Sequence, residues 1–185
     1  YLVEGGVDLL VIETMMSLQE ARAALIAAKE TCELPVMVTL TFESDGRTLF
    51  GTDAKTAAVV LSSLGADAIG ANCSTGPDQM IGIIRDIASV TSIPIIAKPN
   101  AGMPSLDSNG NTVYDMSDVT FAKEMVGIQE AGADILGGCC GTTPEHIREL
   151  KNKFSNVNST QAVRHDMPDK RYLASERQTL EFGLE

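Results

Sequence analysis

Three cysteines stand where an apolar run gives way to a turn and then to a helical stretch. Cys73 lies in the segment GANCSTGPDQ, and Cys139 and Cys140 lie side by side in GGCCGTTPEHI. Threonine and proline follow in both segments, which is typical of the first turn of a helix. Because a helix N-terminus favours the thiolate over the thiol, both segments can present good metal ligands.

Three thiolates at one edge of a fold suggest a zinc site with three protein ligands and an open fourth position. Spacing alone leaves two alternatives: buried cysteine is a common small apolar side chain, and a neighbouring pair can be redox active. Cys32 ends a helical stretch and should lie at the opposite edge. For Cys139 and Cys140 to serve one site, we expect one of residues 138–141 to leave the extended conformation.

Two charged residues also follow apolar runs. Glu13 ends the segment VIET and has no basic neighbour in the sequence. It could accept backbone N–H groups or bind a ligand amine, and both roles remain open. Lys98 could neutralise an acid or, in a metal-free alternative, form a Schiff base with a carbonyl substrate. His146 should be solvated or cap the last helical stretch, and His165 lies in the tail.

Five βα units must position these residues. The apolar runs are continuous rather than alternating, as in strands that are covered on both faces. They span 7–12, 35–40, 66–71, 93–97 and 133–136, and the helical stretches span 18–30, 54–64, 77–89, 119–131 and 144–154. The junctions GGVD, LGAD and AGAD repeat between them. Because no G-x-G-x-x-G follows any run, part of a (β/α)₈ barrel is favoured over a doubly wound sheet.

Two segments fall outside this repeat. The polar loop 101–117 separates the fourth run from its helix, and loops of this length are often functional. The tail 155–185 is interpreted as a linker toward a following domain, with a small strand pair as the alternative. The chain begins with Tyr1 inside what reads as a helix, so we interpret it as part of a longer protein.

The net charge and the apolar content of the chain limit the classes of partner that it can have. The 185 residues carry a net charge of −11, which argues against nucleic acid as a partner. No apolar stretch reaches the ~18 residues of a membrane span, and no basic leader opens the chain. With few cysteines and no leader, a cytoplasmic location is predicted.

The two cysteine segments, together with DLLVIETMMSLQEARAAL, resemble the homocysteine S-methyltransferase family. Within that family they are most similar to the homocysteine-binding modules of cobalamin-dependent methionine synthases. The resemblance covers residues 1–154 and implies the C-terminal five βα units, units 4–8, of a (β/α)₈ TIM barrel. It implies that Cys73, Cys139 and Cys140 hold Zn²⁺ and that Glu13 receives the amino group of the substrate. The early Asp-Gly signature of the family is missing, so exposed strand edges and self-association are expected.

The implied activity is methyl transfer to the thiol of homocysteine, giving methionine, with zinc activating the substrate thiolate. The implied donor is methylcobalamin on another module, whereas other relatives use betaine or S-methylmethionine. The implied partners are therefore homocysteine and the folate and cobalamin modules of the same polypeptide. The alternative is a structural zinc or redox module without catalysis, in which Cys32 or a histidine would complete the metal site.

Overall fold

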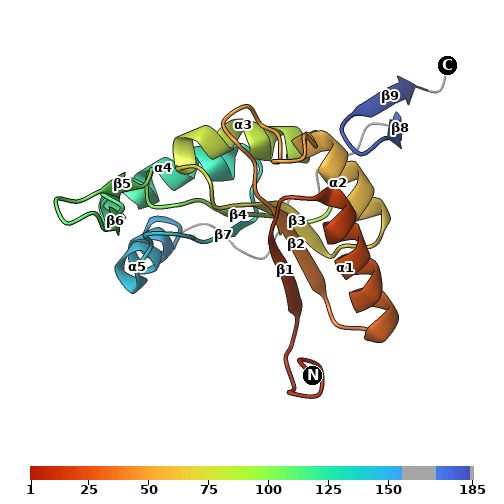
Figure 1. Cartoon of the computed structure of the whole chain (residues 1–185), viewed down its shortest axis with the longest axis horizontal. Helices are drawn as coiled ribbons and strands as arrows, with labels where there is room; N and C mark the ends of the chain where they lie inside the picture. Colours follow the sequence, from red (N-terminus) through yellow and green to blue (C-terminus); the bar gives the residue numbers. More distant parts are fainter. Residues whose placement is uncertain (156–169, 184–185) are drawn as a thin grey trace.

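Five parallel strands form a curved sheet at the centre of the molecule (Figure 1). The computed structural model describes residues 1–155 and 170–183. The strands lie side by side in chain order and pair in parallel throughout. They are β1 (Leu10–Met15), β2 (Val36–Leu40), β3 (Ala68–Asn72), β4 (Ile95–Lys98) and β7 (Ile135–Leu136). This succession confirms an α/β fold with a parallel sheet.

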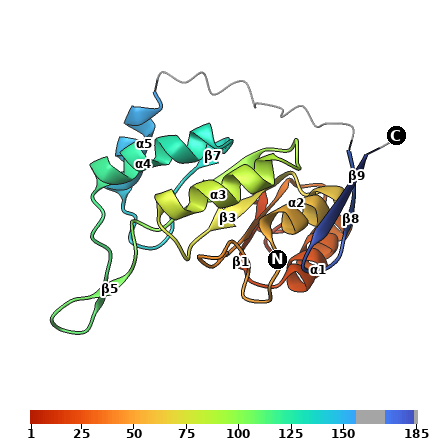
Figure 2. The same ribbon diagram turned by 90° about the horizontal axis from the view of Figure 1, so that it is seen from above.

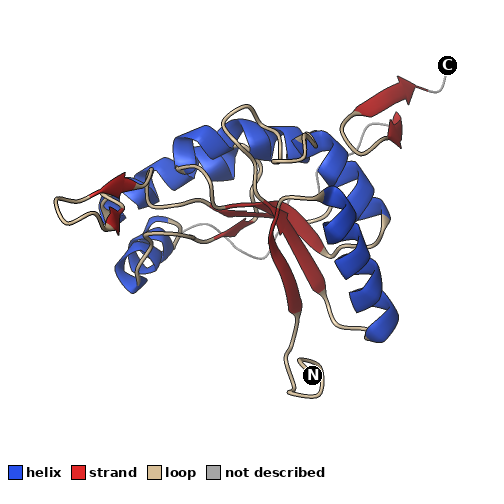
Figure 3. Ribbon diagram, viewed as in Figure 1, coloured by secondary structure: helices blue, strands red, loops and turns tan. Residues whose placement is uncertain are grey.

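A helix follows each of these strands, as the repeat predicts. The helices are α1 (Leu18–Thr31), α2 (Ala54–Ser63), α3 (Pro77–Ala88), α4 (Asp118–Glu130) and α5 (Pro144–Lys153). Helices α1 to α4 arch over the same face of the sheet (Figure 3). None of the helices among the described residues is long and apolar enough to cross a membrane.

The core lies between the sheet and these helices. Alternate residues of β2 point into it, and the helices contribute large side chains that water does not reach, among them Leu25, Leu61, Ile84, Phe121 and Met125. The other face is less well covered, since Val11 on the edge strand β1 is 43% exposed. Burial is therefore concentrated on the helix side of the sheet.

The repeated junctions have a common physical basis. In LGAD, Asp67 Oδ2 accepts the backbone N–H of Val36 at 2.7 Å. In AGAD, Asp134 Oδ2 accepts the backbone N–H of Ile95 at 2.9 Å. Each aspartate thus accepts a backbone N–H group at the start of the neighbouring strand. Without the aspartate, this N–H group would have no partner in the sheet. LGAD and AGAD mark the places where a helix returns to the sheet, whereas GGVD begins within a run of turns at residues 2–6 rather than after a helix.

The loop 101–117 contains a small hairpin, β5 (Ser105–Leu106) and β6 (Thr112–Val113). Its turn is closed by Asp107, whose Oδ1 accepts the N–H groups of Asn109 and Asn111 at 2.8 and 2.9 Å. The loop is therefore ordered, and it lies between β4 and α4 beside the carboxyl edge of the sheet.

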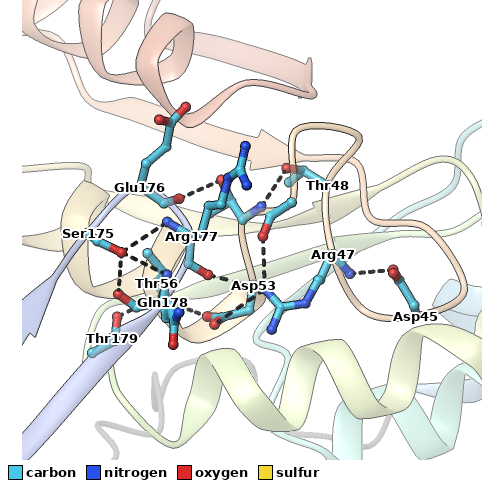
Figure 4. A network of polar contacts seen from close by, with 12 residues as sticks. Asp45, Arg47, Thr48, Asp53, Thr56, Ser175, Glu176, Arg177, Gln178 and Thr179 are labelled. Atoms are coloured by element: carbon cyan, nitrogen blue, oxygen red, sulfur yellow. Dashed lines mark hydrogen bonds and ion pairs between the residues drawn. The ribbon is translucent and has the colours of Figure 1, made fainter.

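The tail forms a second hairpin, β8 (Lys170–Ala174) and β9 (Thr179–Gly183), so the strand-pair alternative describes these residues better than a linker. The hairpin lies against α2 (Figure 2). Its turn contacts the loop that precedes α2 (Figure 4): Thr52 Oγ1 donates to Glu176 O at 2.8 Å, and Arg47 Nη1 donates to Arg177 O at 3.2 Å. A hollow of about 510 Å³ between α1, α2 and β8 lies apart from the cysteine segments. The predicted division at 154/155 stays a prediction, and His165 lies outside the described residues.

Candidate metal centre

Three sulfur atoms meet at the carboxyl edge of the sheet. Cys73 follows β3, and Cys139 and Cys140 follow β7. The Sγ atoms of Cys73 and Cys140 are 3.8 Å apart, those of Cys139 and Cys140 are 3.9 Å apart, and all three lie within 4.8 Å of one another. Tetrahedral zinc with Zn–S bonds of ~2.3 Å would place its sulfur ligands about 3.8 Å apart. The spacing of these sulfurs therefore fits a zinc ion.

The backbone departs from extended geometry at two places around the cluster. Gly141 has φ 78°, which is the expected departure within residues 138–141, although it follows the two cysteines. Cys73 itself has φ 64° and Ser74 has φ 62°, a region that non-glycine residues rarely occupy. This second departure was not expected from the sequence. Strained backbone of this kind concentrates at functional sites, because surrounding contacts must hold it there.

The end of β4 and the residues directly after it hold both cysteine segments. Cys73 N–H donates to Lys98 O at 3.1 Å, and Cys139 N–H donates to Pro99 O at 2.9 Å. Cys140 N–H donates to Asn100 Oδ1 at 3.1 Å. The loop between β4 and α4 thus ties together two segments that are 67 residues apart in the chain. The three thiols are presented by a hydrogen-bonded framework rather than by free loops.

Burial, together with the neighbouring thiols of Cys73 and Cys140, raises the pKa of Cys139 to about 11, while a hydrogen bond from Asn72 opposes the shift. In the metal-free chain Cys139 is therefore a neutral thiol at pH 7. A metal must displace that proton on binding, because only the thiolate is a strong ligand.

Glu13 and Lys98 form an ion pair at the same edge of the sheet. Lys98 Nζ donates to Glu13 Oε1, which joins β1 to β4 across 85 residues of sequence. The pairing of β1 with β2 is irregular between Ile12 and Met15, so Glu13 lies where the strand departs from regular geometry. Lys98 thus neutralises the carboxylate of Glu13. Because its Nζ is held in this ion pair, it is not the free amine that Schiff-base formation would require. The role of Glu13 toward a substrate remains a prediction.

Cys32 and His146 lie apart from the cluster. Cys32 ends α1, where its Sγ contacts Ala28 O at 3.6 Å. His146 is buried rather than solvated: Nδ1 accepts the N–H of Thr143 at 3.2 Å and Nε2 contacts Met116 O at 3.0 Å. Its expected capping role is therefore confirmed. Among the described residues, no further histidine, cysteine or acid joins the three sulfurs as a candidate ligand.

Tyr114 belongs to the site although its sequence position gave little indication of it. A Cβ atom placed on Gly141 would lie 2.4 Å from Cβ and Cγ of Tyr114, so the side chain packs directly on the glycine beside Cys140. Burial and, next, a hydrogen bond to Cys140 raise the pKa of Tyr114. The unusual length of the loop 101–117 was the only signal that could have drawn attention to it.

Fold and site together define the class. The chain is a βα-repeat protein with a parallel sheet and, at the carboxyl ends of its strands, a cluster of three thiols with the spacing of metal ligands. Barrel enzymes place their active sites at this edge.

The chain belongs to the Homocysteine S-methyltransferase family, whose model matches residues 1–154. It is 35% identical over 163 residues to methionine synthase from Mycobacterium leprae, covering 85% of this chain and 13% of the relative. It is 35% identical over 162 residues to methionine synthase from Mycobacterium tuberculosis, covering 84% of this chain and 14% of that relative. The chain therefore spans about one seventh of the length of these relatives.

Solved structures agree with this assignment. The homocysteine methyltransferase MmuM from Escherichia coli is 25% identical in its apo form, with a TM-score of 0.67 over 82% of this chain and 52% of that protein. The metallated form of the same enzyme gives 25% identity and a TM-score of 0.67, over 82% of this chain and 47% of that protein. The described fold thus matches about half of a solved methyltransferase.

Proposed function

We propose that this chain carries the metal centre of an enzyme that transfers a methyl group to the thiol of homocysteine, giving methionine. The observation that carries the proposal is the convergence of three sulfurs, from Cys73, Cys139 and Cys140, within 4.8 Å of one another. Family membership supplies the reaction class, and the sulfur spacing supplies a place for the metal.

Cys73, Cys139 and Cys140 would hold Zn²⁺, and the substrate sulfur would take the fourth position. Bound zinc deprotonates a coordinated thiol outright, whereas a free thiol of pKa ~8.5 is mostly protonated at neutral pH. Three protein thiolates leave the site with a net charge of −1, which keeps electron density on the substrate sulfur. The bound sulfur would lose its proton to solvent, and its bond to the methyl group would form as the bond between methyl and donor breaks, so that no protein base is required.

Glu13 is proposed to receive the amino group of homocysteine. Lys98 occupies its Oε1 atom, which leaves the second carboxylate oxygen, Oε2, for the substrate ammonium. A carboxylate can accept at both oxygens, so the ion pair and the substrate contact are compatible. Lys98 would then hold Glu13 in place rather than compete for it.

The wider context of the site is also part of the proposal. The five βα units would be the C-terminal units of a (β/α)₈ barrel, supported by their match to about half of the Escherichia coli enzyme and by the exposed face of β1. Methylcobalamin on another module is the proposed donor, since two relatives are methionine synthases far longer than this chain. Folate and cobalamin modules are the proposed partners within one polypeptide, and self-association of the isolated chain is expected through β1.

The rival proposal of a structural zinc or redox module makes a different demand on the site. A structural zinc site usually closes with a fourth protein ligand. Within residues 1–155 and 170–183, Cys32 and His146 both lie elsewhere and no other histidine, cysteine or acid approaches the sulfurs. The lack of a fourth histidine, cysteine or acid near the sulfurs among the described residues supports the catalytic proposal.

The test is zinc content and X-ray absorption of the purified chain, with and without homocysteine. We expect one zinc with three sulfur ligands, rising to four sulfurs when homocysteine is added. Cys140→Ala should lower zinc affinity more than ~100-fold, because losing a ligand should exceed the 10–100-fold effect of losing a supporting contact. Cys32→Ala is the matched control and should bind zinc normally. Zinc binding that is unchanged in Cys140→Ala would refute the proposal.

A further inference from the structure

One side-chain amide links the two ends of the candidate site. Asn72 ends β3, directly before Cys73, and is fully buried. Its Oδ1 accepts the N–H of Thr14 at 3.0 Å and the hydroxyl of Thr39 at 2.7 Å. Its Nδ2 donates to Thr14 Oγ1 at 2.7 Å and to Cys139 Sγ at 3.8 Å. Both donors and both acceptor positions of the carboxamide are thus occupied.

The orientation of this amide is fixed by chemistry. The backbone N–H of Thr14 can only donate, so the Asn72 atom facing it must be the oxygen. The NH₂ group must then face the Cys139 sulfur. A donor aimed at sulfur favours the charged thiolate over the neutral thiol, because a hydrogen bond to the charged form stabilises it. Reversing the amide would set two donors against each other at Thr14.

The same amide holds an unusual backbone. Thr14 has φ 60°, a conformation that is costly for a β-branched residue, and it lies in the irregular part of β1 next to Glu13. Asn72 bonds both the N–H and the hydroxyl of Thr14. The main chain of Asn72 is in turn fixed by Thr41, whose hydroxyl donates to Asn72 O at 2.6 Å. Asn72 therefore has the contacts needed to maintain the strained segment that directs Glu13.

We propose that Asn72 is a positioning residue that ties the strand end carrying Glu13 to the sulfur of Cys139. One carboxamide would then set the distance between the amine-binding end and the metal-binding end of the site. This inference rests on the proposed function, which assigns amine binding to Glu13 and metal binding to Cys139. Its contacts can nevertheless be tested without metal or substrate.

The first readout is zinc affinity, measured by competition with a chelator. Asn72→Asp keeps the acceptor for Thr14 and Thr39 but removes the donor to Cys139. Three thiolates around Zn²⁺ would give a site of net charge −1, so a new carboxylate beside it should oppose zinc binding. We expect affinity to fall 10–100-fold, the range for a lost supporting contact. Thr39→Val is the matched control: it removes a contact on the other side of the amide, and its affinity should stay within about threefold.

The second readout is NMR of the metal-free chain. The Thr14 amide should be protected from hydrogen exchange in the unaltered chain and in Asn72→Asp, but at least tenfold less protected in Asn72→Leu. The side-chain NH₂ resonances of Asn72 should move in Cys139→Ala and stay in place in Cys140→Ala. If Asn72→Leu does not fold, the Cys139→Ala comparison still reports the contact.

The outcomes separate this inference from the proposed function. The link to Cys139 would be overturned if zinc affinity were unchanged in Asn72→Asp, or if the Asn72 NH₂ resonances did not move in Cys139→Ala. Equal protection of Thr14 in Asn72→Leu would overturn the link to the strand end. Should the unaltered chain bind zinc no better than Cys140→Ala, the proposed function fails, while the metal-free NMR results still decide for or against the positioning role.

Discussion

At the scale of single residues, the two neighbouring cysteines should differ in reactivity. Cys140 is exposed, whereas Cys139 is partly buried and burial raises its pKa to about 11. A raised thiol pKa keeps the neutral form over a wider pH range, and the neutral thiol is a poor nucleophile. In the metal-free chain we therefore expect iodoacetamide to modify Cys140 first at pH 8. The rate at Cys139 should keep rising as the pH increases toward 11.

Peptide mass spectrometry after timed alkylation measures these rates separately, with Cys32 as an internal reference. Zinc should protect both cysteines together, because both would be ligands of the same ion. The same shift predicts that zinc binds more tightly as the pH rises, because binding releases the Cys139 proton. Equal rates at Cys139 and Cys140 at pH 8 would contradict the burial of Cys139.

The sequence located the cysteines but not the contacts that shape them. Cys73, Cys139 and Cys140 could be found because each follows an apolar run, and the carboxyl ends of parallel strands share one edge. The pairing of Lys98 with Glu13 joins residues that are 85 positions apart, so no local sequence pattern could predict it. His146 was expected to be solvated or to cap α5; it caps the helix, but its burial under the loop before α4, where Met116 O accepts from Nε2, could not be predicted.

At the scale of elements, the βα junction at Asp67 should contribute to stability in a pH-dependent way. Burial pushes the pKa of this carboxyl up, but hydrogen bonds from Lys29 and the Val36 N–H outweigh it and hold the pKa below its usual value. A depressed pKa gives stability that is present above the unfolded pKa of ~3.9 and is lost as the pH falls through the lower folded value.

Asp67→Asn should therefore destabilise the chain at pH 7 by about 1 kcal/mol, a value reduced for solvent screening because the Asp67 side chain is 46% exposed. Urea denaturation at pH 7, 5 and 3 measures the difference, which should shrink toward pH 3. Glu30→Gln, at an exposed position beside Lys29, serves as the control and should change little. A difference that stays constant down to pH 3 would show that the charge of Asp67 is not involved.

The sequence predicted the buried strands of the central sheet, but it did not predict the short hairpin that is defined by its turn. The runs that became β2, β3 and β4 are almost continuously buried, which leaves a strong sequence signal, whereas β1 is partly exposed and begins three residues later than its run. The last run, 133–136, yields only the two-residue strand Ile135–Leu136, since Gly137 and Gly138 follow at once. The β5–β6 hairpin was missed because each strand has two residues. The turn signal in DSNGN, with Asp107 bonding its own loop, could have revealed it.

At the scale of the whole molecule, the tail hairpin is attached to α2 and the preceding loop by hydrogen bonds of both its backbone and its side chains. Arg177 O accepts from Arg47 Nη1 at 3.2 Å and from the Asp53 N–H at 3.4 Å, and Thr179 Oγ1 donates to Thr56 Oγ1 at 2.9 Å (Figure 4). Asp53 caps α2, so the hairpin turn supports the start of that helix. Strand propensity alone could not predict this docking, because an isolated two-stranded hairpin is marginal and needs a surface to pack on.

A chain ending at residue 169 should therefore lose stability, by about 1–3 kcal/mol for the lost hydrogen bonds, or roughly 2–12 °C in Tm. Exchange of backbone amides at the start of α2 should quicken, because the Asp53 N–H and the Thr52 hydroxyl lose their partners. Arg177→Ala is the matched control, since it removes the side chain and leaves the accepting carbonyl. Zinc affinity should stay the same in both, because the three sulfurs follow β3 and β7 rather than α2. A truncated chain as stable as the full one would show that the hairpin only rests on α2, which would restore the interpretation of the tail as a linker.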